Sequence, residues 1–302
     1  MRCAVDVPNF GDFADPRVVA DLARRAEEAG WDGLFVWDHV THRKALRRTI
    51  ADPWVLLTAA ALATERIRLG TMITPVARRR VSKLAREVTT LDRLTGGRMI
   101  LGVGLGAPIA DEFGSFGETT DPKELAARLD EGLTALSLLW SGEPVTFRGE
   151  HVVVEDVTFL PTPVQRPRVP VWVGGEWPAR PPMRRAARWD GAVPLLRDDG
   201  GKPRQPDPAT VREIRDFLSR ERARAGRDRE PFDLVLSGTS SGAATDLVGP
   251  LAEAGGTWWL ECRWDDLERA EPMVRRADHG DGSDLWDVPR SHRLAGMMGP
   301  MK

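Results

Sequence analysis

The chain of 302 residues contains no tyrosine, only two cysteines and no long apolar run. Because a membrane-spanning helix needs about 18 or more consecutive apolar residues, no segment is expected to cross a membrane. The N-terminus enters a strand pattern at once and lacks the apolar core of a signal peptide, which predicts a cytoplasmic protein. The missing tyrosine, with arginine far more frequent than lysine, indicates a compositional bias rather than a catalytic feature.

An excess of positive charge is also missing, since the formal net charge is −2. Nucleic acid is therefore not expected as the main partner, because no basic excess is available to neutralise its phosphates. The arginine clusters at 78–80 and 184–185 are balanced overall by neighbouring acids. The hydrophobic share of 41% and the charged share of 29% are typical of a soluble globular protein.

The two cysteines lie at the start of the first expected strand (Cys3) and after the last one (Cys262). In a closed barrel these strands are parallel neighbours, so the two residues lie near opposite ends. Several residues of offset, at about 3.3 Å each, exceed the ~7 Å Cα separation that a disulfide allows. Two separate thiols are therefore predicted, as suits a cytoplasmic protein.

Eight short apolar strands alternate with helical segments, and nearly every strand ends in a polar, glycine-rich or aromatic-acidic cluster. The expected strands cover residues 2–7, 33–37, 67–73, 99–105, 169–173, 191–195, 233–237 and 257–261. This α/β rhythm predicts a (β/α)8 TIM barrel, in which the active site lies at the C-terminal ends of the strands.

The rhythm is interrupted after the fourth strand, where the next helix is expected only at 122–140. A two-stranded excursion over 145–154 and a proline-rich return follow it. Residues 107–168 are therefore predicted to form an insertion that covers one side of the site as a lid. Residues 1–278 are predicted to form a single barrel domain, and 279–302 a disordered tail.

The sharpest candidate site is Asp38-His39, at the end of the second strand. Histidine exchanges a proton near neutral pH, and a neighbouring acid can orient it, so this pair is the predicted catalytic centre. A pair that only stabilises the loop is about as well supported by the spacing alone. A metal site is less favoured, because the sequence has no HxH or HExxH motif.

A candidate anion site follows the fifth strand at Gly174-Gly175-Glu176, ahead of Arg180, Arg184, Arg185 and Arg188. Paired glycines let backbone N–H groups approach a phosphate, and arginine can hold it with two hydrogen bonds. A tight turn followed by a solvated helix face is the simpler alternative. The glycines at 102, 104 and 106 do not match a dinucleotide fingerprint and are expected to let a flat ring lie against the strand end.

Taken together, these segments resemble the luciferase-like monooxygenase family over roughly residues 1–262. The strongest stretches are ARRAEEAGWDGLFVWDH (23–39), LAREVTTLDRLTGGRMILGVG (84–104) and LPTPVQRPRVPVWVGG (160–175). The resemblance implies reduced FMN or a deazaflavin, coenzyme F420, lying across the strand ends. It also implies a small organic substrate, and either monooxygenation with FMN or hydride transfer with the deazaflavin.

The resemblance also assigns roles to individual residues. Asp38 and His39 match the ring-side acid and histidine, and a non-prolyl cis peptide that backs the ring would fall at Met72-Ile73. The remaining implied coenzyme contacts are Gly104, Gly106, Gly174, Gly175, Glu176, Arg180 and Arg184, with Arg185 as a further phosphate neighbour. The family further implies a homodimer and, for an FMN enzyme, a flavin reductase as partner.

The chain departs from this pattern in two places. The deazaflavin sugar-phosphate dehydrogenases carry an acid just after the strand-four glycines, where this chain has Ala107-Pro108. The turn after strand five is rich in proline, which leaves only residues 174–177 as amide donors to a phosphate. Two other functions compete with the flavin enzyme: a non-catalytic flavin-binding or subunit homologue, and a cofactor-free barrel hydrolase or isomerase using Asp6 and Glu261.

Overall fold

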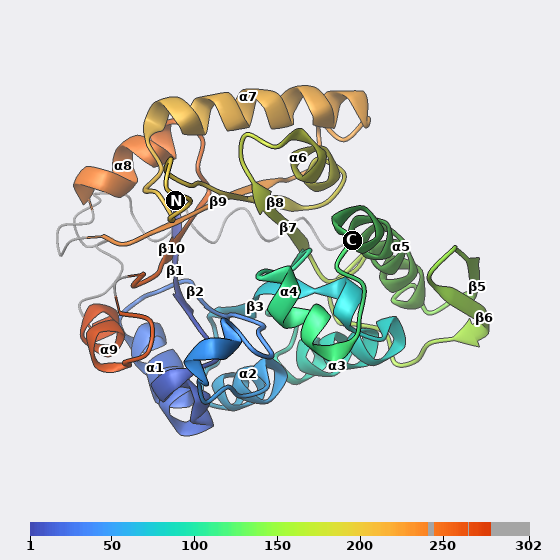
Figure 1. Ribbon diagram of the computed structural model, residues 1–302, viewed down its shortest axis with the longest axis horizontal. Helices are drawn as coiled ribbons and strands as arrows, with labels where there is room; N and C mark the ends of the chain where they lie inside the picture. The colour runs from blue at the N-terminus through green and yellow to red at the C-terminus, as the bar shows by residue number, and fades with distance from the viewer. Residues whose placement is uncertain (241–244, 265, 279–302) are drawn as a thin grey trace, which may run out of the picture.

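The computed structural model describes residues 1–240, 245–264 and 266–278. Eight parallel strands close into a barrel in the order β1-β10-β9-β8-β7-β4-β3-β2, which confirms the predicted (β/α)8 fold (Figure 1). The barrel strands are β1 (Arg2–Val7), β2 (Gly33–Val36), β3 (Arg68–Pro75), β4 (Met99–Gly104), β7 (Val171–Glu176), β8 (Gly191–Leu195), β9 (Asp233–Gly238) and β10 (Trp258–Glu261).

Helices surround the strands on the outside (Figure 1). The α-helices are α1 (Pro16–Glu28), α2 (Pro53–Leu62), α3 (Val81–Leu94), α4 (Ile109–Glu112), α5 (Pro122–Leu139), α6 (Arg180–Ala186), α7 (Pro208–Arg224), α8 (Thr245–Glu253) and α9 (Glu271–Asp278). Short 3-10 turns are η1 (Gly11–Ala14), η2 (Lys44–Leu46), η3 (Val76–Arg78) and η4 (Gly114–Phe116).

Four of the long helices begin with the same Asp-Pro pair. An aspartate carboxylate accepts a backbone N–H of the first turn, and the proline occupies a position whose N–H would have no helical partner. The capping residues are Asp15 of α1, Asp52 of α2, Asp121 of α5 and Asp207 of α7. Each cap fixes where the chain leaves a strand-end loop.

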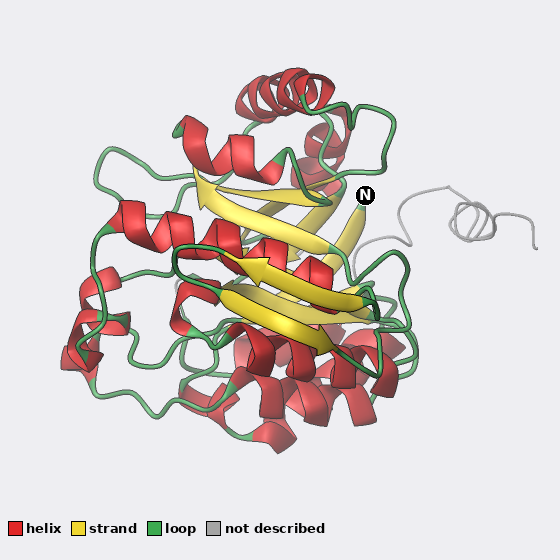
Figure 2. Ribbon diagram, turned by 90° about the vertical axis from the view of Figure 1, so that its right-hand side faces the viewer, coloured by secondary structure: helices red, strands yellow, loops and turns green. Residues whose placement is uncertain are grey.

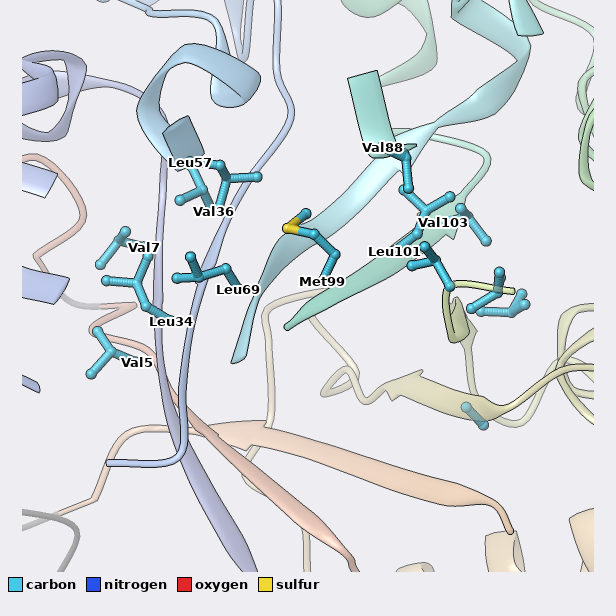
Figure 3. Packing of buried hydrophobic residues seen from close by; sticks show 14 of the residues in the cluster. Val5, Val7, Leu34, Val36, Leu57, Leu69, Val88, Met99, Leu101 and Val103 are labelled. Atoms are coloured by element: carbon cyan, nitrogen blue, oxygen red, sulfur yellow. The ribbon is translucent and has the colours of Figure 1, made fainter. Parts of the chain in front are cut away.

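Side chains alternate along each strand between the barrel interior and the helix layer. Those that face the helices form the larger core, as Figure 3 shows for Val5, Val7, Leu34 and Val36. The interior is filled by a second cluster: Ala4, Phe35, Met72, Ile100, Trp172, Val235, Trp258 and Leu260. Trp258 belongs to the interior cluster and its neighbour Trp259 to the outer one, as strand alternation predicts.

The insertion does not form a single lid. Strands β5 (Pro144–Arg148) and β6 (Val153–Thr158) pair antiparallel and lie against the outer side of α5 (Figure 2). Glu131 of α5 fixes this hairpin, because its carboxylate accepts the amides of residues 150, 151 and 152 at 2.8–2.9 Å. The hairpin thus packs on α5, whereas Glu112 of α4 contacts His39 at the strand ends and α5 itself contacts η3, directly after β3.

Both cysteines are buried thiols, as predicted. Helix α9 was not predicted; it packs on α1, where Trp31 Nε1 donates to the carbonyl of Ala277 at 3.1 Å. The predicted tail at 279–302 lies outside the described residues. Among the helices that the structure describes, none is long and apolar enough to cross a membrane.

Candidate active site

The backbone of His39 is clamped just beyond the end of β2. Asn9, fully buried after β1, donates from Nδ2 to the carbonyl of His39 at 2.8 Å and to that of Ala51 at 2.7 Å. Its Oδ1 accepts the His39 amide at 3.2 Å. One amide side chain therefore joins the loop after β1 to both ends of the loop after β2 and sets the position from which the imidazole projects.

The ring of His39 is held by Glu112, the last residue of α4. Its Nδ1 lies 3.0 Å from Glu112 Oε1, and the same carboxylate accepts the amides of Val40 at 3.0 Å and Thr41 at 3.3 Å. The Arg78 guanidinium also contacts Glu112. Burial alone would raise the pKa of Glu112, but the hydrogen bond and charge of His39, the Val40 amide and Arg78 together lower it. Glu112 is therefore an anion that orients His39.

Asp38, the predicted partner of His39, instead binds two arginines. Its buried carboxylate accepts from Arg78 at 2.6 Å and from Arg79 at 2.8–3.1 Å. Arg78 also donates to the Asp38 carbonyl at 2.9 Å. This geometry matches the loop-stabilising alternative for Asp38, and the acid that contacts the imidazole is Glu112.

Aromatic rings enclose His39 on the side of β1. Its ring centroid lies 5.7 Å from that of Trp37 and 4.3 Å from that of His42, and His42 stacks on Phe10 at 5.3 Å. Burial, followed by the positive charges of His39 and Arg48, lowers the pKa of His42 to about 4. His42 is therefore neutral at physiological pH and acts as an apolar wall beside His39.

A flat, small-residue surface lies across the ends of β3, β4 and β7. The peptide between Met72 and Ile73 is cis, as predicted. A Cβ on Gly104 would stand 2.0 Å from Ile73 Cδ1, and one on Gly174 would stand 3.1 Å from the same atom. The missing side chains let Ile73 lie over both glycines, so the Ile73 side chain would form the surface against which a flat ring lies. These residues fit the face of a flavin or deazaflavin.

The expected phosphate site is less open than its glycines suggest. Gly174, Gly175 and Glu176 belong to β7 and pair with β8, and the Trp177 amide donates to Leu195 O at 3.0 Å. The β4–β7 pairing ends at Val173, so by strand alternation the Glu176 amide points beyond the end of β4. The Trp177 amide is therefore engaged, and Glu176 N–H is the main amide left for an anion.

The four arginines named for this site differ in availability, and Arg188 is exposed with Asp130 at 3.4 Å. Arg185 is buried and binds the Asp130 carboxylate with two nitrogens at 2.7 and 2.9 Å, so it is excluded as a phosphate ligand. Arg180 stacks between the rings of Trp177 and Phe217, 4.5 Å from each centroid. Arg184 is 58% exposed, with Glu221 at 3.7 Å. Arg180 and Arg184 remain candidates at the rim.

The carboxylate pair of the competing hydrolase does not exist. Asp6 faces the barrel interior, whereas Glu261 lies on the outer side of β10 and accepts from Ser240 Oγ at 2.6 Å and Trp259 Nε1 at 3.0 Å. The two acids therefore face opposite sides of the barrel wall. Gly106 lies past the end of β4 with φ +85°, a turn conformation that favours glycine, beside Pro75 and Phe113 rather than at the flat surface.

Four residues of this site were not identified as site residues from the sequence: Asn9, Arg78, Arg79 and Glu112. The cluster at 78–80 was interpreted only as balanced by acids, yet it begins three positions after the end of β3, where barrel enzymes carry site residues. Glu112 lies eight positions past the strand-four glycine Gly104, at the end of the one-turn helix α4, and no periodicity places it beside His39. Contacts between separate strand-end loops depend on barrel closure.

The luciferase-like monooxygenase family matches residues 5–247. The chain belongs to this family. It is 36% identical over 170 residues to the F420-dependent glucose-6-phosphate dehydrogenase of Intrasporangium calvum, covering 55% of the chain and 50% of that protein. The enzyme of the same name from Microbacterium testaceum is 31% identical over 226 residues, 73% of the chain and 63% of that protein. The chain thus spans about half to two thirds of the length of these relatives.

Solved structures share the fold. The coenzyme F420 dependent tetrahydromethanopterin reductase from Methanopyrus kandleri superposes with a TM-score of 0.71 at 17% identity, covering 92% of this chain and 98% of that one. An F420-dependent secondary alcohol dehydrogenase has a TM-score of 0.67 at 20% identity, covering 92% and 83%. A type II Baeyer-Villiger monooxygenase from Pseudomonas putida, in complex with FMN, has a TM-score of 0.64 at 19% identity, covering 94% and 78%.

Proposed function

We propose that this protein is an oxidoreductase that binds a deazaflavin or flavin coenzyme at the strand ends and uses His39 to move a proton. The observation that carries the proposal is the double hold on His39. Asn9 fixes its backbone and Glu112 fixes Nδ1, while Nε2 has no partner among the described residues. An imidazole positioned so firmly, with one nitrogen left over beside a flat surface, is suited to acid–base chemistry.

The protein's own residues would orient the coenzyme, exclude water from the site and transfer a proton. Ile73, Gly104 and Gly174 would support one face of the ring, and Glu176 N–H with Arg180 and Arg184 would hold the phosphate. The neutral His42 ring and Trp37 would exclude water around the imidazole. With its Nδ1 proton donated to Glu112, His39 would take or give a proton at Nε2. The coenzyme, when bound, supplies the hydride or oxygen chemistry.

Hydride transfer with coenzyme F420 is the favoured reaction, because the most similar curated proteins reported above are F420-dependent dehydrogenases. FMN is the second candidate, because the glycine surface contacts only a ring face, which both coenzymes offer. An FMN enzyme would carry out monooxygenation and require a flavin reductase as partner. A non-catalytic homologue that binds the coenzyme without turnover is the alternative from another class.

The substrate is proposed to be small, organic and largely apolar, bound beneath the segment around α4. Ala107 and Pro108 occupy the position where the sugar-phosphate dehydrogenases carry an acid, so glucose 6-phosphate itself is not proposed. The single 1–278 domain, a cytoplasmic location and a homodimer remain part of the proposal by analogy with the family.

The decisive experiment is a fluorescence titration of the purified protein with coenzyme F420 and, separately, with FMN. Tight binding of F420 alone supports a dehydrogenase or reductase, and the substrate search turns to hydride donors and acceptors. Tight binding of FMN alone supports the monooxygenase. Binding of neither contradicts the proposal. Gly175→Ala tests the position of the phosphate. Its new Cβ would meet Pro182 at 2.2 Å and displace the start of α6 from the end of β7, so coenzyme affinity should fall if this strand end holds the phosphate.

A further inference from the structure

Asp6 occupies the boundary between the filled and the open part of the barrel. It follows Ala4 on the interior face of β1, and Ala4 belongs to the interior cluster with Phe35 and Leu260. On the mouth side, Ile73 and Val193 are only partly buried. Asp6 itself is 5% exposed. Its carboxyl group therefore forms part of the floor on which a ligand at the strand ends would rest.

The hydrogen bonding of this carboxyl group is incomplete. Trp37 Nε1 donates to Oδ2 at 3.1 Å, and Oδ1 is buried without a partner among the described residues. No cation of the described chain balances it: burial raises the pKa of Asp6 well above its usual range, and only the Trp37 hydrogen bond opposes that rise. A buried carboxylate with one neutral donor is costly, so this group favours its neutral form.

The opposite end of the barrel provides an internal comparison. There Asp233 also accepts from an indole, Trp172 Nε1, at 3.2 Å, but its second oxygen accepts from Thr257 Oγ1 at 2.9 Å. Both carboxyl oxygens of Asp233 are thus hydrogen-bonded, whereas Oδ1 of Asp6 is not. The carboxyl group with the unpaired oxygen lies at the end where barrel enzymes bind their ligands.

We propose that Asp6 is a neutral carboxylic acid whose hydroxyl donates a hydrogen bond to an acceptor atom of the bound ligand. The acceptor would be a carbonyl or hydroxyl oxygen, or a ring nitrogen, of the coenzyme or the substrate. The inference rests on the proposed function only in requiring a ligand at the strand ends. Carboxylic acids kept neutral by apolar surroundings act as donors at neutral pH in other active sites. An anion here would repel electron-rich ligand atoms, whereas a neutral acid attracts them.

The protonation state is tested without any ligand. Because the pKa of Asp6 is raised on folding, its stabilising contribution is present at low pH and is lost as the pH rises above the unfolded value of about 3.9. Asp6→Asn removes that loss, so the variant should have a flatter stability curve from pH 4 to 8. Infrared spectroscopy should detect a protonated carboxyl band at pH 7 that disappears in Asp6→Asn. Absence of this band in the wild type overturns the inference.

The ligand contact is tested by titrating coenzyme F420 and FMN against three variants. Asp6→Leu cannot donate a hydrogen bond, so it should bind the coenzyme, alone or together with substrate, about tenfold more weakly than the wild type. Asp6→Asn keeps a donor, so its dissociation constant should stay within about threefold of the wild-type value. Asp233→Asn is the matched control and should bind as the wild type does. The carboxyl band of the wild type should also shift when the ligand binds.

Each outcome separates this inference from the proposed function. If Asp6→Leu binds as tightly as the wild type and the band does not move, Asp6 serves an internal water or the fold only, and the inference is wrong. If the wild type binds neither coenzyme, the proposed function and the ligand contact both fail. The infrared band would then still report whether Asp6 is neutral.

Discussion

The Nδ1 atom of His39 lies 3.0 Å from Oε1 of Glu112, although 73 positions separate the two residues. The side chain of His39 is 16% exposed and that of Glu112 is fully buried. The contact joins the loop after β2 to the segment after β4, so closure of the barrel is needed to form it. It makes Glu112, rather than the adjacent Asp38, the residue that sets the direction of the imidazole.

Glu112→Gln should lower kcat without a comparable change in coenzyme affinity. The amide keeps the size of the carboxylate but loses the charge that stabilises a protonated His39, so kcat should fall by at least about tenfold and its pH profile should shift. Steady-state kinetics across pH 5–9 measure this effect. Asp111→Asn is the control, since the Asp111 carboxylate accepts the exposed Lys44 amide and the bond of Thr41 to the Asp111 carbonyl is kept. Equal effects of the two variants would contradict the role of Glu112.

His39→Ala should separate chemistry from binding. Loss of a positioned acid–base group costs roughly 10²–10⁴-fold in rate, whereas the ring surface at Gly104 and Gly174 is untouched. The coenzyme dissociation constant should therefore stay within about threefold of the wild-type value. Single-turnover kinetics and a binding titration measure the two effects. Unchanged turnover would favour a barrel in which His39 has only a structural role.

The sequence alone was sufficient for the barrel and the location of its mouth. The alternation of strands and helices is a local pattern, and it placed β1 and β8 at the observed bounds. The cis peptide at Met72-Ile73 followed from the family resemblance. Local patterns could not reveal that Asp38 turns toward Arg78 and Arg79. The direction of the Asp38 side chain depends on which buried charged groups lie beside it once the loops are folded together.

The hairpin of the insertion illustrates the same limit. Its strands and turn were readable from the sequence, but its docking surface was not. Glu131 looks like an ordinary exposed helix residue until the amides of residues 150–152 converge on it. A carboxylate that accepts several backbone amides is a tertiary feature with no sequence periodicity. The whole insertion was predicted to cover one side of the site, whereas the structure docks its hairpin on α5.

Asp38→Asn should be strongly destabilising. Replacing the carboxylate leaves the charges of Arg78 and Arg79 in a buried site with one partner fewer, and breaking a buried ion pair costs roughly 3–5 kcal/mol. Chemical denaturation measures the free energy of unfolding. Asp21→Asn, which removes exposed helical ion pairs with Arg24 and Arg25, should produce little measurable loss. Similar losses in both variants would show that the Asp38 cluster does not stabilise the fold.

Two neighbouring glycines of β4 should respond differently to alanine. In Gly102→Ala the new Cβ would meet the backbone oxygen of Thr71 at 2.2 Å, and the sheet must distort, at a cost of about 1–3 kcal/mol or more. In Gly104→Ala it would meet the end of the Ile73 side chain, which can move. The second variant should fold with near-normal stability but bind the coenzyme about tenfold more weakly. Thermal unfolding and coenzyme titration, run on both variants, test this separation.

His42 should make the protein sensitive to moderate acid. Its pKa falls from 6.5 to about 4 on folding, so the unfolded chain binds the proton more tightly. The stabilising contribution is therefore present above pH 6.5 and is lost progressively as the pH falls to about 4. Burial is the main cause, and the charges of His39, Arg48 and Arg43 act in the same direction, opposed by Glu112.

The variant His42→Phe isolates this effect, because phenylalanine can keep the stacking on Phe10 and cannot bind a proton. Its free energy of unfolding should change less than that of the wild type between pH 6.5 and 4. Below pH 4 both proteins should lose stability, since the lowered pKa of Glu112 adds its own loss there. Urea denaturation at half-unit pH intervals measures the two curves. Parallel curves between pH 6.5 and 4 would mean that His42 is protonated in the folded protein and that the ring beside His39 carries a charge.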